Sequence, residues 1–204
     1  MSWKLNPMSS CSKYKRRSSM IDAENNCWNK TRKKAKRKIL ELRKGILIRN
    51  ATKDDLEKIL EIERASFKHI DAFSPTLFKK YLRELEEGFF VVLEKPNSIV
   101  GYAILGEEDG KGYLLSIAIH PKKRNQGFAT SLLKFLEFKC YEKGLTKMTL
   151  EVRVNNKKAI AIYKNLGFTE VGKKKGFYED GVDALVMEKR LPIWMGLPPQ
   201  SSII

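Results

Sequence analysis

The chain has 204 residues, 42% of them hydrophobic, which is enough for one domain with a sizeable core plus extensions. No apolar run reaches the roughly 18–20 residues that cross a bilayer, so we expect no membrane span and no membrane partner. Three cysteines without a C-x-x-C pair and only two histidines argue against a disulfide framework and against a metal site. This cysteine usage suits a reducing compartment, so we predict a cytoplasmic protein.

The net charge of +16 is concentrated at the start of the chain. Residues 1–45 carry 14 Lys and Arg against three acids, a net of +11, which leaves +5 for residues 46–204. We predict that 1–45 form a basic, largely disordered extension, with a basic helix over 30–44 as one option. Such a segment is either a solvated tail or a weak contact to RNA or a ribosome, and the lack of aromatic residues within 30–44 favours the tail.

The globular part is predicted to begin with a short strand over 46–49 and a helix capped by Thr52. A second helix follows from Ser74-Pro75 to Leu85, because a capping serine precedes a proline at the first helical position. The remaining elements are predicted as strands over 89–93, 99–105 and 113–119, a helix over 128–143, a strand over 147–154, a helix over 156–166, and strands over 168–171 and 184–189. This order predicts an α/β (α+β) domain over 46–191, followed by a tail over 192–204.

The segment from Tyr113 to Thr130 carries the clearest functional signal. Its hydrophobic strand ends at Ile119, and a turn containing Arg124-Asn-Gln-Gly127 then opens a long amphipathic helix. A helix N-terminus offers unpaired N–H groups and positive dipole, and a glycine lets a phosphate approach the backbone. The segment therefore predicts a phosphate-bearing ligand, although it contains neither the dinucleotide-binding glycines nor a P-loop.

A second group of residues lies on the next strand and helix. Glu151 and Arg153 share the strand face opposite Leu150. Asn156 and Tyr163 are seven positions apart and so fall within about 20° of each other on a helix. Taken singly, these residues are also typical of a solvent-facing pair, an N-cap and a half-buried helix residue.

Two motifs in this region resemble those of a known superfamily. Arg-x-x-Gly-x-Ala at 124–129 resembles the acetyl-CoA pyrophosphate loop of the GNAT acetyltransferases. The run Leu-Glu-Val-Arg-x-x-Asn-x-x-Ala-Ile-x-x-Tyr-x-x-x-Gly-Phe at 150–168 resembles RimI-type protein N-terminal (ribosomal-protein-alanine) acetyltransferases. The resemblance covers about 46–190 and implies the GNAT fold, a mixed, mostly antiparallel sheet of about six to seven strands flanked by about four helices.

The resemblance also implies roles for individual residues. Glu151 takes the position of the general base and Tyr163 that of the general acid, while Phe67 and Tyr178 take substrate-binding positions. The implied acetyl-CoA contacts are Ile117, Ala118, Ile119, Arg124, Asn125, Gln126, Gly127, Phe128, Ala129, Thr130 and Asn156. Two departures from the family pattern concern substrate recognition: Phe177-Tyr178 replaces a Tyr-Tyr pair, and the loop 72–75 lacks the usual Pro-Trp.

The sequence therefore predicts an acetyl-CoA-dependent N-acetyltransferase without a metal, which acetylates the α-amine of protein N-termini by direct attack in a ternary complex. Its expected partners are N-terminal peptides, including those of ribosomal proteins or nascent chains. One alternative is a GNAT enzyme for a small-molecule amine or a lysine side chain. Another is a ribosome- or RNA-associated binding module with a vestigial site.

Overall fold

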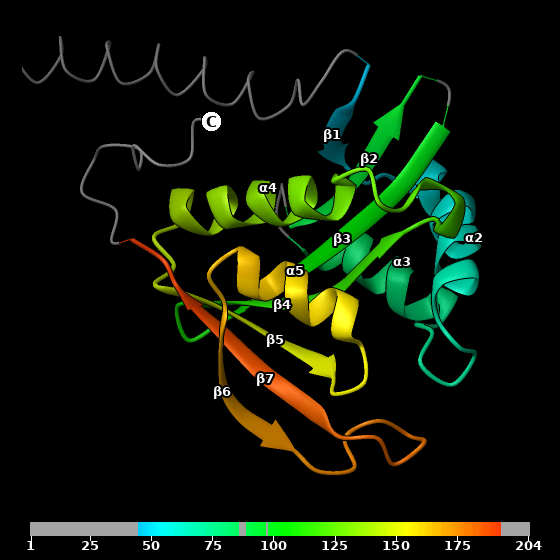
Figure 1. Ribbon diagram of the computed structural model, residues 1–204. Coiled ribbons are helices and arrows are strands. Elements are labelled where there is room, and N and C mark those ends of the chain that lie inside the picture. Colours follow the sequence, from blue (N-terminus) through cyan, green and yellow to red (C-terminus); the bar gives the residue numbers. More distant parts are fainter. Residues whose placement is uncertain (1–44, 86–88, 97, 193–204) are drawn as a thin grey trace, which may run out of the picture. The chain divides into compact units, whose positions relative to one another are not determined.

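The computed structural model describes residues 45–85, 89–96 and 98–192, and it shows a seven-stranded mixed sheet with helices on both faces (Figure 1). The strand order is β1-β2-β3-β4-β5-β7-β6, and every neighbouring pair is antiparallel except β4–β5. This confirms the predicted fold class. The predictions for 1–44, including the helix over 30–44, and for 193–204 lie outside the described residues.

The strands are β1 (Leu47–Asn50), β2 (Phe90–Lys95), β3 (Ser98–Glu108), β4 (Lys111–Ile119), β5 (Lys147–Arg153), β6 (Thr169–Lys174) and β7 (Ala184–Arg190). The helices are α2 (Leu56–Ser66), α3 (Pro75–Glu84), α4 (Phe128–Glu142) and α5 (Lys157–Asn165), with short 3₁₀ helices η1 (Lys53–Asp55) and η2 (Pro121–Lys123). Each predicted strand is present, and only the two 3₁₀ helices were not predicted as such. None of the helices in the described part of the chain is long and apolar enough to cross a membrane.

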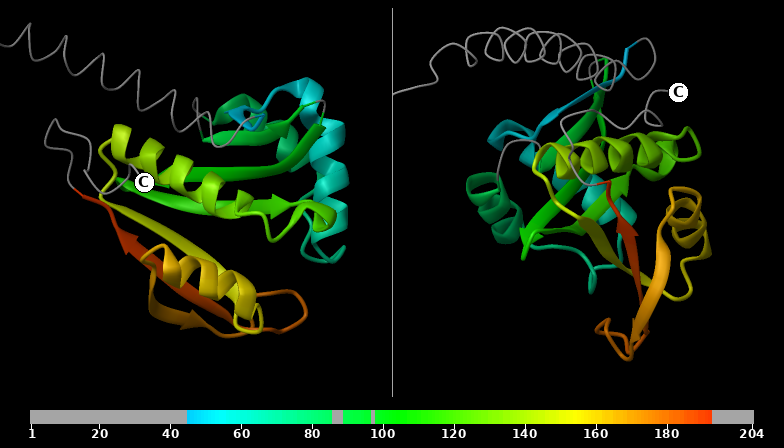
Figure 2. Two further views of the ribbon diagram at one scale, coloured as in Figure 1. Left: turned by 45° about the horizontal axis from the view of Figure 1, so that its top comes forward. Right: turned by 90° about the vertical axis from the view of Figure 1, so that its left-hand side faces the viewer.

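The helices cover the two faces of the sheet in pairs, with α4 and α5 on one face and α2 and α3 on the other (Figure 2). The α4 side is filled by leucine and aromatic side chains such as Leu132, Leu136 and Phe168. The α2 side is smaller and centres on Phe78 and Tyr102, whose rings meet edge to face at 5.5 Å. Because both faces are covered, the central strands are apolar on both sides and read as continuous hydrophobic runs.

The parallel pair β4–β5 is short, and its end opens the sheet. Pairing runs from Lys111 opposite Lys147 to Leu114 opposite Leu150, and both strands then continue without each other. At this point β4 contains a bulge, because Ile104 of β3 faces Ser116 whereas Leu105 faces Leu114. A bulge bends its strand and increases the local twist, so β4 diverges from β5 beyond Leu115 (Figures 1 and 2).

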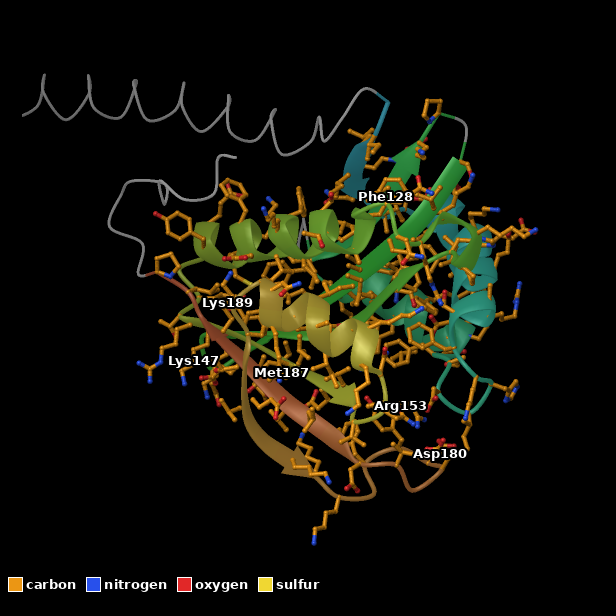
Figure 3. The ribbon with its side chains drawn as sticks, viewed as in Figure 1. Phe128, Lys147, Arg153, Asp180, Met187 and Lys189 are labelled. Atoms are coloured by element: carbon orange, nitrogen blue, oxygen red, sulfur yellow. The ribbon has the colours of Figure 1, made fainter. Side chains whose placement is uncertain are left out.

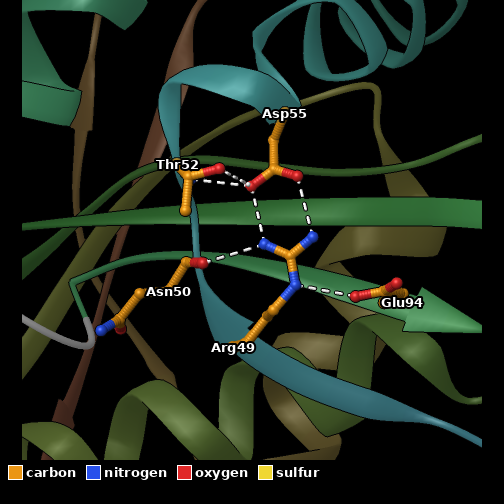
Figure 4. A network of polar contacts seen from close by, with 5 residues as sticks. All are labelled: Arg49, Asn50, Thr52, Asp55 and Glu94. Atoms are coloured by element: carbon orange, nitrogen blue, oxygen red, sulfur yellow. Dashed lines mark hydrogen bonds and ion pairs between the residues drawn. The ribbon is translucent and has the colours of Figure 1, made fainter.

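An ionic network fastens β1 to the sheet and to the start of α2 (Figure 4). Arg49 donates two hydrogen bonds to the buried Asp55, at 2.7 and 2.8 Å, and a third to Glu94 on β2 at 2.7 Å. The Thr52 N–H and hydroxyl also donate to Asp55, as expected for a residue at a helix start. Burial raises the pKa of Asp55, but the hydrogen bonds from Arg49 and Thr52 outweigh it and lower this pKa overall.

We expect Asp55→Asn to destabilise the domain by about 1–3 kcal/mol at pH 7, because Arg49 then loses its main acceptor. A carboxyl whose pKa is lowered by folding stabilises the protein above its unfolded pKa, near 3.9, and that contribution disappears as pH falls through the folded pKa. The difference in unfolding free energy between the variant and the parent should therefore be full at pH 7 and shrink below about pH 4. Urea unfolding at several pH values measures this, and a difference that is independent of pH would contradict it.

Candidate active site

The turn before α4 has the geometry of an anion site. Asn125 and Gly127 both have positive φ, at 60° and 80°, and Gly127 is the N-cap of the 15-residue helix α4. A Cβ placed on Gly127 would meet nothing within 4 Å, so the space in front of the helix N-terminus is open. The Arg124 Nε donates to the Ile119 carbonyl at 3.0 Å and thereby fixes this turn to the end of β4.

The predicted cofactor residues on either side of this turn point their side chains into the core. Ile119 and Phe128 belong to the α4-side cluster, and Ala118 belongs to the α2-side cluster. Ile117 and Ala129 are partly buried against the α4-side cluster. A ligand could therefore meet these residues chiefly through their backbone groups.

Glu151 lies on β5 just past the last pair with β4, with its side chain 24% exposed. Its partner is Lys174 on β6, whose Nζ donates to Glu151 Oε1 at 2.9 Å. The same Nζ lies 5.1 Å from the centroid of the Phe177 ring. The carboxylate is thus held at the open end of the sheet by an ion pair that leaves it accessible to solvent.

Tyr163 is buried, which differs from the half-buried position that its sequence context suggests in isolation. Its ring meets Phe168 edge to face at 5.8 Å within the α4-side cluster. Burial, with a smaller contribution from Tyr178, raises the pKa of Tyr163 well above its usual range. The phenol therefore keeps its proton throughout the physiological pH range.

Tyr178 lies against the end of the strand that carries Glu151. Burial raises its pKa, Arg153 opposes that effect, and the charges of Asp71 and Glu151 act in the same direction as burial. The Tyr178 ring lies 4.0 Å from the guanidinium carbon of Arg153, two residues after Glu151 on β5. Tyr163 packs in the α4-side cluster, which also contains apolar residues of β5.

Two other predicted residues have structural roles in addition to any contact with ligand. Asn156 caps α5, because its side chain accepts from the Ala159 N–H at 3.2 Å. Phe67, at the C-terminal end of α2, is partly buried against the α2-side cluster.

The ion-pair partners of Arg153 were not predicted from the sequence. The sequence suggests an i, i+2 pair with Glu151, but the structure pairs Glu151 with Lys174 and Arg153 with Asp71 and Asp180. These partners are 82 and 27 positions away, so no local spacing could indicate them. Arg153 thus joins two loops beside the candidate site.

Comparisons with known proteins agree with this geometry. The acetyltransferase (GNAT) family model matches residues 55–168. An N-alpha-acetyltransferase from Saccharolobus solfataricus is 34% identical over 157 residues, which cover 71% of this chain and 92% of the relative. The solved ribosomal-protein-S18-alanine N-acetyltransferase from Escherichia coli has a TM-score of 0.63 at 25% identity, covering 76% of this chain and 97% of that one. YncA of Salmonella typhimurium, a putative acetyltransferase solved with acetyl-CoA, shares the fold, with a TM-score of 0.62 at 21% identity over 73% of this chain and 95% of that one.

A strand edge opened beside a helix N-terminus suits a long cofactor that carries phosphate groups. The chain belongs to the GNAT acetyltransferase family, and it is an N-acetyltransferase that uses acetyl-CoA. Its residues fit that cofactor, because the open turn at Gly127 suits the diphosphate and the backbone freed on β4 suits the amide groups of the pantetheine arm.

We expect Gly127→Ala to raise the KM for acetyl-CoA several-fold. A Cβ at φ 80° is strained by about 1 kcal/mol and also occupies the space in front of the helix. Gly127→Asn is the matched variant, since asparagine tolerates the left-handed region: it should cost less stability yet raise the KM at least as much. Initial rates with varied acetyl-CoA, together with thermal unfolding, separate the two effects, and an unchanged KM in both variants would contradict the assignment.

Proposed function

We propose that this enzyme transfers the acetyl group of acetyl-CoA to the α-amine of protein N-terminal peptides, by direct attack in a ternary complex. The observation that carries the proposal is the position of Glu151 on β5, just beyond its last pair with β4 and partly exposed, with Tyr178 against the end of the same strand. Tyr163, on the helix that follows, packs in the cluster that contains β5 residues. The similarity to an archaeal N-alpha-acetyltransferase and to a ribosomal-protein-alanine N-acetyltransferase supports it.

The chemistry favours an α-amine over a lysine side chain. An α-amine has a pKa of about 7.7–8.0 and a lysine amine about 10.4, so deprotonation at pH 7 costs about 1–1.4 kcal/mol for the first and nearly 5 for the second. A single carboxylate that acts through water, as proposed for Glu151, suits the smaller of these costs.

In the proposed reaction the neutral amine attacks the thioester carbonyl, and the carbon–sulfur bond then breaks. Glu151 accepts the proton that the amine loses, through a water molecule. Tyr163 gives its proton to the departing thiolate, and its burial keeps that proton available. Backbone N–H groups at 117–119, beyond the end of β4–β5 pairing, stabilise the carbonyl oxygen as negative charge develops.

The cofactor lies, in this proposal, with its diphosphate on the backbone of 124–130 and with Asn156 in contact with its arm. The Asn156 oxygen already caps α5, so the amide NH₂ is the group free to face the cofactor. Phe67 and Tyr178 contact the peptide. Ribosomal proteins or nascent chains are the proposed source of that peptide, and contact of residues 1–45 with RNA and a cytoplasmic location remain predictions.

The substrate class is tested with two peptides of the same sequence, one with a free N-terminus and one with a blocked N-terminus and an internal lysine. We expect kcat/KM for the free α-amine to exceed that for the blocked peptide by at least about a hundredfold, in line with the pKa difference. Mass spectrometry of the products locates the acetyl group. Equal rates on both peptides would favour a lysine acetyltransferase instead.

The roles of the two catalytic residues are tested with Glu151→Gln and Tyr163→Phe. Each should lower kcat by about 10²–10⁴ while the Kd for acetyl-CoA stays nearly unchanged, because general acid or base catalysis supplies about that much. Glu170→Gln is the matched control, since this exposed acid on β6 also pairs with a lysine, Lys164, at 2.9 Å. Unchanged turnover in either catalytic variant removes that residue from the mechanism.

The pH dependence gives a further check on Tyr163. A raised pKa keeps the phenol protonated, so the acid role predicts no fall in kcat on the alkaline side below about pH 10, the usual pKa of tyrosine. A pH–rate profile at saturating substrates measures this. An alkaline limb between pH 8 and 9 that disappears in Tyr163→Phe would contradict the assignment.

A further inference from the structure

We propose that Arg153 is a positioning residue for the peptide substrate, because it ties the α2–α3 loop (67–74) to the β6–β7 loop (175–183). The inference rests on the proposed function, in which these loops carry the peptide-contacting residues Phe67 and Tyr178. The inference adds that the contacts of Arg153 hold the two loops at a fixed separation.

Arg153 is placed at the C-terminal end of β5, and its guanidinium makes three contacts at once. One nitrogen, Nη2, donates to Asp71 on the α2–α3 loop. The other, Nη1, donates to both oxygens of Asp180 on the β6–β7 loop, at 2.8 and 3.0 Å. The guanidinium carbon also lies 4.0 Å from the centroid of the Tyr178 ring (Arg153 and Asp180 are labelled in Figure 3).

The contact with Asp71 is partly buried, which distinguishes it from an ordinary surface ion pair, whereas the contact with Asp180 is more exposed. The side chains of Arg153 and Asp71 are 16% and 13% exposed, and that of Asp180 is 27% exposed. A second link between the loops, Lys68 to Asp180 at 3.7 Å, involves a lysine that is 76% exposed and so contributes little. A planar guanidinium can serve two carboxylates and stack on an aromatic ring, whereas an ammonium group cannot do all three.

Each loop is also held by hydrogen bonds on its own side of the site, and two of them show this. In the α2–α3 loop, the Phe73 N–H donates to the buried Glu63 of α2 at 2.7 Å. In the β6–β7 loop, the Tyr178 N–H donates to the Val182 carbonyl at 3.1 Å. Loss of Arg153 would leave the carboxylates of Asp71 and Asp180 near each other with only the exposed Lys68 as a counter-charge, so we expect the loops to separate.

On both loops an exposed apolar side chain is next in sequence to a residue that contacts Arg153; we call the contacts of Arg153 with Asp71, Asp180 and Tyr178 the tie. Ile70 precedes Asp71 and is 42% exposed, and Phe177 precedes Tyr178 and is 47% exposed. In the proposed function the peptide passes between these loops, so the tie fixes the distance between the two apolar surfaces. Loops that are free to move must be ordered when the peptide binds, and that entropy cost weakens peptide binding.

The experiment measures both KM values for Arg153→Gln in the full chain, with a free N-terminal peptide and acetyl-CoA varied in turn. We expect the KM for peptide to rise about tenfold or more, with the KM for acetyl-CoA within twofold of the parent. Arg153→Lys should give an intermediate rise, because one ion pair is retained. Lys147→Gln is the matched control, since Lys147 also lies on β5 and pairs with Glu188 at 2.9 Å, but at the strand's opposite end (Figure 3).

Amide hydrogen exchange of residues 67–74 and 175–183 provides a readout that needs no substrate. The proposal predicts faster exchange in both loops of Arg153→Gln and unchanged exchange in Lys147→Gln. If Arg153→Gln does not fold, Asp180→Asn gives the same test from the more exposed side of the tie. Unchanged exchange together with an unchanged peptide KM overturns the inference, as does an equal rise in both KM values. Failure of the parent enzyme to acetylate any free N-terminal peptide instead overturns the proposed function.

Discussion

The parallel pairing of β4 with β5 covers four residues of each strand, and the site depends on where it stops. A bulge at Leu115 turns β4 away, so the backbone of 117–119 is released from β5 while β3 still holds its other edge. The same divergence places the end of β4 beside the turn that starts α4, through the Arg124 contact to Ile119. One irregularity in the sheet therefore both exposes a strand edge and sets its distance from a helix N-terminus.

The proposed substrate side of the site is held together by ion pairs between side chains rather than by strand pairing. Glu151 and Arg153 lie on the same strand, but their partners lie on different elements. Glu151 pairs with Lys174 on β6, whereas Arg153 pairs with two loop aspartates. This arrangement keeps the two opposite charges from neutralising each other. Glu151 remains at the solvent-accessible end of the opening, while Arg153 is used to hold the surrounding loops.

Much of the fold could be predicted from the sequence because its signals are local. The caps at Ser74 and Asn156 and the Arg124–Gly127 turn each depend on residues that are close along the chain, and the structure bears them out. The ionic contacts of Arg153 could not be predicted, because they join residues that only tertiary packing brings together. The burial of Tyr163 likewise follows from the placement of α5 over the sheet, which helical spacing alone does not fix.

The location of Tyr163 within the main apolar cluster has a consequence for heat inactivation. Its ring is packed against Phe168 and the other members of that cluster, so its orientation is maintained by the same contacts that hold α5 on the sheet. On the proposed assignment, the proton donor has no loop or hinge that could adjust its position separately. Loosening of α5 would then abolish turnover before the rest of the domain melts, and activity would decline at lower temperature than the bulk of the secondary structure.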